Sequence, residues 1–350
     1  MGVTTLSSNL DQYEDMIFSK CMECGCIQIK NLIPLEVLYA DGHASVIGET
    51  WDRHHREFCE FVKKYIKGYI VEIGGANLMV AKRLAQEERV KKITVFDNNI
   101  LQYQNGQNIP DKISLKEEFF NPTKVKENID AIIHTHLIEH LYNPLEEILD
   151  MSHLLKDGSY MMFAMPLVDE MLKANFTNAM NFEHTYLIDL KVVENILNFC
   201  SFEIVEKKNF SPYAAFIIAR KNDTIKQNVV NLYPNHSNVF NGFCQYHTNE
   251  VKKIKNQINT DKENTFIFGA HIFTQYLFSF GLTPNLFSNI LDNDPAKQNN
   301  RLYGTQLEVK SPKILKNIEK PLVVLKAAMY TEEIRRDILE NINPNTRFIL

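Results

Sequence analysis

The sequence predicts an α/β protein with a Rossmann-like central sheet, and two stretches carry this prediction. Residues 70–99 read as an apolar strand, a glycine turn, a helix and a second strand that ends on an acid, IVEIGGANLMVAKRLAQEERVKKITVFDNN. Residues 129–166 read as a strand, a loop of acidic and histidine residues, an amphipathic helix, an Asp-Gly turn and another apolar strand. Alternating strands and helices are typical of βαβ units.

The first stretch is suited to binding a nucleoside. Gly74 and Gly75 let the backbone turn sharply and approach a ligand. Glu72 ends the first strand, and Asp97 ends the second strand 25 residues later, where an acid can accept both hydroxyls of a ribose. The G-x-G-x-x-G pattern of dinucleotide sites is incomplete, because Leu78 stands at its third glycine position and no P-loop lysine follows. The stretch therefore favours S-adenosylmethionine (SAM), which needs the acid but no phosphate-binding loop.

The second stretch lies downstream and reads IDAIIHTHLIEHLYNPLEEILDMSHLLKDGSYMMFAMP. It resembles the class I methyltransferases that carry the pattern D…HxxEH…P…LLKxGG…P, with Glu139 and His140 on the loop after the fourth strand. The two blocks in this order indicate a SAM-dependent class I methyltransferase. The residues expected to bind the cofactor lie at the ends of these strands: Glu72, Gly74, Gly75, Asn77, Asp97, Asn98, His136 and His140.

Composition limits the other function classes. The chain has 350 residues, of which 45% are hydrophobic, so it can bury a full core in two or three domains. Its net charge of -5 argues against a general nucleic-acid binder. No run of 18 apolar residues appears, and the N-terminus lacks a basic region before an apolar stretch. We expect a cytoplasmic protein with a small-molecule substrate and without nucleic-acid or membrane partners.

Three regions follow from the pattern along the chain. Residues 1–65 form a cysteine-containing N-terminal module and a helix, and residues 66–220 form the SAM-binding domain, which ends in two apolar strands suited to an antiparallel edge pair. A polar stretch opens residues 221–350, which repeat the strand and helix pattern in TFIFGAHIFTQYLFSFGL and LFSNILDNDPAKQ. We interpret this part as a smaller Rossmann-like domain. A scaffold that helps to hold substrate is favoured there over a second nucleotide site.

A narrower resemblance covers nearly the whole chain. The segments CMECGCIQI, VEIGGANL, NFEHTYLIDLKVVENIL and LDNDPAKQ resemble the C-methyltransferases of deoxysugar biosynthesis. That resemblance implies an N-terminal zinc module, a central methyltransferase domain, a C-terminal Rossmann-like domain, and nucleotide-linked 4-keto sugars as substrates. By position, Glu183 and His184 correspond to the Glu-His pair of that family, and Tyr186 to the tyrosine that follows it.

Methyl transfer to a carbon beside a ketone requires a base that removes one proton. Histidine has a suitable pKa, and a neighbouring carboxylate can orient it and stabilise the imidazolium. We therefore expect His184 as the general base, with Glu183 and Tyr186 as the other catalytic residues. His136 and His140 are alternatives for the base, because they lie at the mouth of the cofactor site.

The sequence also departs from that family. Its zinc module has two CxxC pairs, whereas only Cys21 and Cys24 form one here, so we expect a truncated module without a metal ion. Leu78 is expected to crowd the cofactor carboxylate. The catalytic tyrosine of the zinc module has no secure counterpart, since LYADGHAS offers Tyr39 and His43. Methylation of oxygen or nitrogen on a related small molecule, and ligand binding without turnover, therefore stay open as alternatives.

Overall fold

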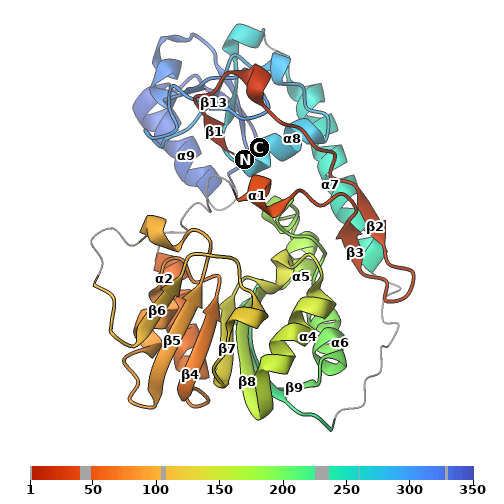
Figure 1. The fold of residues 1–350 in the computed structure, drawn as a ribbon. Helices are drawn as coiled ribbons and strands as arrows, with labels where there is room; N and C mark the ends of the chain where they lie inside the picture. The colour runs from red at the N-terminus through yellow and green to blue at the C-terminus, as the bar shows by residue number, and fades with distance from the viewer. Residues whose placement is uncertain (1, 40–48, 104–107, 225–235, 260, 328–329) are drawn as a thin grey trace. The chain divides into compact units, whose positions relative to one another are not determined.

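The computed structural model describes residues 2–39, 49–103, 108–224, 236–259, 261–327 and 330–350 (Figure 1). The chain divides into two compact units. The large unit comprises Met16–Ala174 and Ala179–Ser237, and the small unit comprises Met1–Asp15, Asn175–Asn178 and Asn238–Leu350. The chain thus begins in the small unit, builds the large unit and returns.

A seven-stranded sheet forms the centre of the large unit, in the order β6-β5-β4-β7-β8-β10-β9. β10 is antiparallel to both of its neighbours, and all other pairs are parallel. The chain runs from β4 outward to β6 and then returns to the other side of β4, so the topological switch point lies between β4 and β7. The strands are β4 (Gly68–Ile73), β5 (Val90–Phe96), β6 (Ile113–Lys116), β7 (Ile129–Thr135), β8 (Leu155–Pro166), β9 (Phe202–Ser211) and β10 (Ala214–Lys221).

The helices of the large unit bury apolar faces against this sheet. Phe58 and Val62 of α2 (Glu49–Val62) share one core cluster with Ile70 of β4 and Leu84 of α3 (Met79–Leu84). In α2 the buried side chains recur at helical spacing, which explains why the stretch folds as a helix against the sheet. The unit also holds α1 (Leu35–Leu38), α4 (Pro144–Leu154), α5 (Val168–Lys173) and α6 (Leu190–Phe199), with α4 and α6 side by side in Figure 1.

The cysteine-rich segment forms a small hairpin from β2 (Phe18–Lys20) and β3 (Ile27–Ile29). β3 also pairs with a segment far along the chain, because the amide of Ile29 donates to the carbonyl of Thr185 at 2.8 Å. The amide of Leu187 donates to the carbonyl of Ile27 at 2.7 Å. The hairpin therefore fixes residues 185–187, directly after His184.

The small unit is built on a second sheet, a parallel one of five strands in the order β14-β12-β11-β15-β16. Its strands are short, and Phe266, Ile267 and Val324 are among the buried apolar residues on its two faces. The strands are β11 (Thr265–Phe268), β12 (Asn289–Leu291), β14 (Val309–Lys310), β15 (Leu322–Leu325) and β16 (Arg347–Ile349). The helices are α7 (His236–Gln257), α8 (Ile272–Ser279) and α9 (Thr331–Asp337), the last continued by a π turn over Ile338–Ile342.

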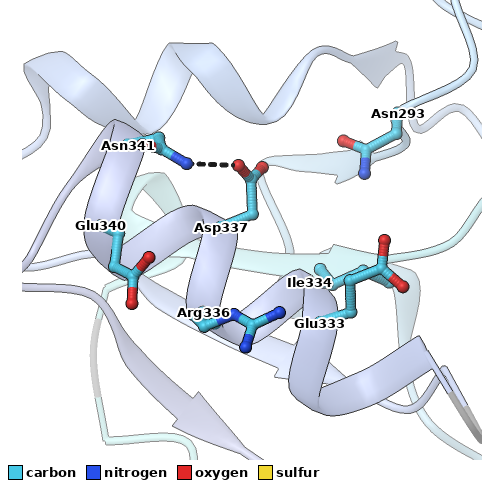
Figure 2. Close-up of a pocket in the computed structure, with 7 residues that line it drawn as sticks. All are labelled: Asn293, Glu333, Ile334, Arg336, Asp337, Glu340 and Asn341. Carbon is cyan, nitrogen blue, oxygen red and sulfur yellow. Dashed lines mark hydrogen bonds between the residues drawn. The ribbon is translucent and has the colours of Figure 1, made fainter.

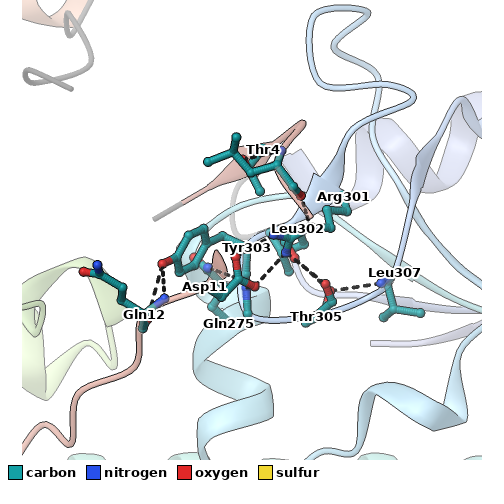
Figure 3. A network of polar contacts seen from close by, with 11 residues as sticks. Thr4, Asp11, Gln12, Gln275, Arg301, Leu302, Tyr303, Thr305 and Leu307 are labelled. Carbon is teal, nitrogen blue, oxygen red and sulfur yellow. Dashed lines mark hydrogen bonds and ion pairs between the residues drawn. The ribbon is translucent and has the colours of Figure 1, made fainter. Parts of the chain in front are cut away.

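The first residues of the chain are tied to the small unit. The strand β1 (Val3–Thr4) pairs antiparallel with β13 (Arg301–Leu302). The Arg301 guanidinium donates two hydrogen bonds to the Asp11 carboxylate, at 2.5 and 2.7 Å, and the Asp11 side chain is fully buried (Figure 3). Two charges held in this bidentate geometry fix both distance and orientation. Residues 2–15, which the sequence places beside the cysteine segment, thus pack against the small unit.

Several boundaries differ from those that the sequence predicts. Asp157 and Gly158, which the sequence predicts to form a turn, lie within β8. There the register of β8 against β7 shifts between Ile129 and Ala131. α7 begins at His236, within the part that the sequence analysis describes as a polar stretch. The expected edge pair forms as β9 and β10. Across the described ranges, no helix has the length and apolarity needed to cross a bilayer.

Candidate functional site

The glycine turn after β4 is packed onto a buried acid. Gly74 has a φ of +76°, in the left-handed region that favours glycine. A Cβ atom on Gly75 would lie 2.7 Å from Cδ of Glu72, so only glycine leaves room for that carboxyl group. Glu72 is 4% exposed and its Oε2 has no hydrogen-bond partner among the described residues. Burial raises the pKa of Glu72 to about 8.

Asp97 lies directly after β5, next to the glycine turn. The amide of Gly74 donates to the carbonyl of Phe96 at 2.8 Å, which joins the turn to the end of β5. One Asp97 carboxylate oxygen, Oδ1, accepts from the amide of Asn99 at 2.8 Å, and the side chain is half-buried. Asn98, also half-buried, accepts from the side chain of Asn99 at 3.2 Å. The end of β5 therefore presents an acid beside the glycine turn, as a nucleoside site requires.

The helix α3 begins in an unusual way. Leu78 precedes it with a φ of +57°, a conformation that is rare for a leucine. Its side chain is 1% exposed and lies in the core cluster with Val80 and Leu84, so the expectation that it crowds the cofactor carboxylate is wrong. Asn77 is exposed, and its side-chain oxygen accepts from the amide of Met79 at 3.0 Å, which caps the first turn.

A group of histidines surrounds a carboxylate at the end of β7. His136 has a φ of +54°, and its Nδ1 lies 3.1 Å from Oε1 of Glu139. Its Nε2 lies 3.3 Å from Nε2 of His54, a buried residue of α2. Burial, together with the neighbouring His136, lowers the pKa of His54 to about 3, so His54 is neutral. When Nδ1 of His136 donates to the Glu139 carboxylate, the neutral His54 can donate its Nε2–H to Nε2 of His136.

Glu139 is the centre of this group, in the 3-10 turn Ile138–His140. Its side chain is 1% exposed, and burial acts to raise its pKa. The hydrogen bond from His136 and the nearby His140 and His184 outweigh burial and hold the pKa below its ordinary value. Glu139 is therefore ionised. Its Oε2 has no hydrogen-bond partner in the described part of the chain.

His184 comes to Glu139 from a distant part of the sequence. One carboxylate oxygen of Glu139 and one ring nitrogen each of His140 and His184 all lie within 4.8 Å of one another. The His140 and His184 rings meet edge to face, with centroids 5.2 Å apart. Nδ1 of His184 lies 2.9 Å from the carbonyl oxygen of Ala179 and donates to it, which leaves the lone pair on Nε2.

Two backbone contacts hold His184 in this position. The hydroxyl of Tyr186 donates to the carbonyl of Ile138 at 2.6 Å, and the amide of Thr185 donates to the carbonyl of Glu139 at 3.1 Å. Tyr186 is 4% exposed, and its buried hydroxyl ties the loop that carries His184 to the turn at Ile138. Glu183 is half-buried, and its amide donates to the Asn181 side chain at 2.8 Å.

Three residues of this group are not among the cofactor-binding and catalytic residues expected from the sequence: Glu139, His54 and Tyr39. The spacing HxxEH was a signal for Glu139, because it places His136 and Glu139 one turn apart. Tyr39 gave a weaker signal; its hydroxyl lies 3.4 Å from Nδ1 of His140. His43, the other candidate in that stretch, lies outside the described residues. His54 could not be separated from the neighbouring His55 without the structure, since both are buried on α2.

The cysteines form no comparable group. All six are free thiols, and Cys21 and Cys24 are half-buried in the turn between β2 and β3. The buried Cys26 thiol donates to the carbonyl of Leu187 at 3.7 Å. Within the described ranges, no set of three metal-ligating side chains includes a cysteine.

The small unit has a pocket of its own on α9 (Figure 2). Its volume is about 270 Å³, and it is lined mainly by charged and amide side chains of α9, the π turn and the loop after β12. Asn341 donates to Asp337 across it at 2.8 Å. The pocket is below the usual size of a small-molecule site and carries three carboxylates, Glu333, Asp337 and Glu340, so it does not suit an apolar or anionic ligand.

The match to a family model agrees with the geometry of the large unit. Residues 51–207 match the model of the methyltransferase domain family. This part of the chain is a class I methyltransferase domain. Its cofactor is SAM, and the protein is an enzyme. No curated protein matches the chain.

Solved structures similar to this methyltransferase cover about half of the chain. The N-methyltransferase NodS from Bradyrhizobium japonicum, in complex with S-adenosyl-L-homocysteine, is 16% identical, with 50% of this chain and 89% of NodS covered and a TM-score of 0.38. Human N-acetylserotonin methyltransferase, in complex with SAM, is 17% identical, with 50% of this chain and 53% of the human chain covered and a TM-score of 0.43.

Proposed function

We propose that this methyltransferase acts on a nucleotide-activated sugar or a surface-glycan precursor, with His184 as its general base. The observation that supports the proposal is the group of Glu139, His140 and His184 at the end of β7, in the same sheet as the glycine turn and Asp97. An acid for the cofactor and a base for the acceptor thus occupy the same edge of one sheet, at the carboxyl ends of its parallel strands, where ligands of such sheets bind.

The cofactor residues fit SAM in two respects. The turn at Gly75 packs directly onto the buried Glu72, since a Cβ there would lie 2.7 Å from Cδ of Glu72, and this contact fixes the position of the turn. Asp97 is half-buried beside it and is suited to accept ribose hydroxyls. When bound, SAM supplies an electrophilic methyl group on its sulfonium sulfur. In this proposal Gly74, Gly75, Asp97 and Asn98 hold the adenosine part, and Glu72 supports the turn from below.

The base is oriented by the protein before any acceptor arrives. The hydrogen bond from Nδ1 of His184 to the Ala179 carbonyl fixes the tautomer and leaves Nε2 able to take a proton. The ionised Glu139 would stabilise the imidazolium that results. We propose Glu139 for the orienting role that the sequence suggested for Glu183, and a positioning role for Tyr186.

The small unit supports a scaffold role in this proposal. Its strand order and the turn Gly269–His271 after β11 are Rossmann-like, and Asp292 follows β12 at the position of a ribose-binding acid. The Asp292 carboxylate, however, already accepts from the amide of Ala270 at 2.8 Å and lies 3.3 Å from Nζ of Lys297. Because these contacts occupy the Asp292 carboxylate, it is poorly placed to bind a ribose, which disfavours a second nucleotide site. We therefore propose that this smaller Rossmann-like domain, within 221–350, helps to hold substrate.

The test is transfer of a labelled methyl group from SAM to a panel of nucleotide sugars, with mass spectra of the products. The proposal predicts one methylated nucleotide sugar and S-adenosylhomocysteine in equal amounts. For a carbon acceptor, the enzyme should also exchange a proton beside the ketone with deuterated water, whereas methylation of oxygen or nitrogen forms no enolate. SAM binding without any product across the panel would contradict the proposed substrate class.

A further inference from the structure

The group of Glu139, His140 and His184 has the composition of a metal site as well as that of a base. Two imidazoles and one carboxylate are the ligands of catalytic zinc and of non-haem iron, which keep other coordination positions open. In the described part of the chain, this is the one set of at least three histidine, cysteine or acidic side chains whose donor atoms converge, all within 4.8 Å. From the sequence alone, no metal ion is expected.

In both histidines Nδ1 has a neighbour on the protein, and Nε2 is the nitrogen that a metal ion beside the carboxylate would use. Nδ1 of His184 is taken by the Ala179 carbonyl at 2.9 Å, so Nε2 is the nitrogen able to bind a metal. Nε2 of His140 lies 3.9 Å from Oε1 of Glu139, and its Nδ1 lies 3.4 Å from the Tyr39 hydroxyl. Metal-binding histidines usually have such a partner on the second nitrogen, which fixes the ring and its tautomer.

Glu139 supplies an independent observation. Glu139 is only 1% exposed, and its Oε2 has no hydrogen-bond partner among the described residues. A buried carboxylate oxygen without a partner is costly, since it has lost its water without replacement. Nε2 of His140 is nearer to the other oxygen, Oε1, at 3.9 Å, so a cation that both carboxylate oxygens bind would remove that cost. The base mechanism alone leaves Oε2 without a partner.

We propose that Glu139, His140 and His184 bind one divalent first-row transition-metal ion, which, if the proposed function is right, coordinates an oxygen of the acceptor. Metal to ligand bonds of about 2.0 to 2.2 Å would bring the three donors to within about 3.5 Å of one another. The side chains therefore close by about 1 Å on metal binding, which the half-buried histidines allow. Two imidazoles favour zinc, iron, nickel or copper over magnesium, calcium and manganese, which prefer oxygen ligands.

The metal would change how the acceptor is activated. With the metal bound, the lone pair of His184 is used in coordination, and the ion lowers the pKa of a bound hydroxyl instead. This favours an oxygen acceptor, with its proton released to water. The metal-free protein would retain His184 as a base.

The test is metal binding by the full-length protein after chelator treatment. Titration with Co²⁺, followed by calorimetry and visible absorption, should give one ion per chain, which Zn²⁺ then displaces. Glu139→Gln and His184→Ala should each weaken Co²⁺ binding by at least about 100-fold, because each removes a ligand. His153→Ala is the matched control, since this exposed histidine of α4 lies outside the group, and it should bind Co²⁺ like the wild type.

Circular dichroism of each variant establishes that it is folded, and His140→Ala replaces Glu139→Gln if the buried substitution unfolds the protein. Absence of Co²⁺ binding, or binding that survives both substitutions, would overturn the proposal. Methyl transfer is measured in parallel. Full turnover by the metal-free protein would contradict a role of the metal in activating the acceptor. It would not contradict the proposed methyltransferase function. Site-specific Co²⁺ binding without methylation of any nucleotide sugar would support the metal site and contradict the proposed function.

Discussion

The carboxyl group of Glu72 fills the space that a side chain at Gly75 would need, since a Cβ atom there would lie 2.7 Å from both Cδ and Oε1 of Glu72. The acid and the glycine therefore depend on each other. The turn can lie this close to the Glu72 carboxyl group only because residue 75 is a glycine and has no side chain. This relationship makes the turn sensitive to the smallest substitution.

Gly75→Ala should displace Glu72 and lower both stability and SAM affinity. An extra methyl group in a tightly packed place costs about 1 to 3 kcal/mol of unfolding free energy. Gly242→Ala is the control, because nothing lies within 4 Å of a Cβ there and the residue is in α7. Thermal unfolding and calorimetry with SAM measure the two effects. Equal stability of the two variants would contradict the packing described for Gly75.

Asp97→Ala should weaken SAM binding by at least about tenfold, because charge-assisted hydrogen bonds to ribose hydroxyls contribute about 1.5 to 3 kcal/mol each. Asp111→Ala, an exposed acid before β6, carries the same charge change and should bind SAM normally. Calorimetry of both variants gives the comparison. Unchanged affinity in Asp97→Ala would remove Asp97 from the cofactor site.

Glu72→Gln should make stability less dependent on pH. The Glu72 pKa is about 8 in the folded protein and about 4.5 when unfolded. Between these values only the folded chain keeps the proton, so the wild-type unfolding free energy decreases as pH rises through this window. Glutamine has no proton to lose. Relative to the wild type, the variant should therefore gain up to about 4 kcal/mol between about pH 5 and pH 8.5.

Urea unfolding at a series of pH values measures this gain. Glu60→Gln is the control, because this exposed acid of α2 should leave the pH profile unchanged. A constant difference between Glu72→Gln and the wild type would show that Glu72 titrates normally in the folded protein.

Arg301→Gln should release the first residues of the chain from the small unit. The variant removes both hydrogen bonds to Asp11, whose side chain would be left buried and charged. Limited proteolysis with N-terminal sequencing should then detect earlier cleavage before residue 16. Arg335→Gln, in an exposed pair with Glu332, should not change the cleavage pattern.

The sequence predicts the elements with strong local patterns. The stretch from β4 to β5 has apolar strands, a glycine turn and a terminal acid, so its fold and the place of Asp97 follow from the residues alone. The pairing of β1 with β13 was not predictable, because two-residue strands almost 300 positions apart carry no periodicity. The Glu139 to His184 contact arises in the same way, from a loop that Tyr186 and β3 fix at a distance.

The turnover of His184→Asn, at saturating SAM and acceptor, tests the central claim most directly. Asparagine can keep a hydrogen bond to the Ala179 carbonyl but cannot take the proton or replace the ring nitrogen at Nε2. We predict that SAM affinity stays within about twofold, while turnover falls by about 10² to 10⁴, the usual effect of removing a general base. Full turnover in His184→Asn, with SAM bound as in the wild type, would contradict the claim that acceptor activation depends on His184.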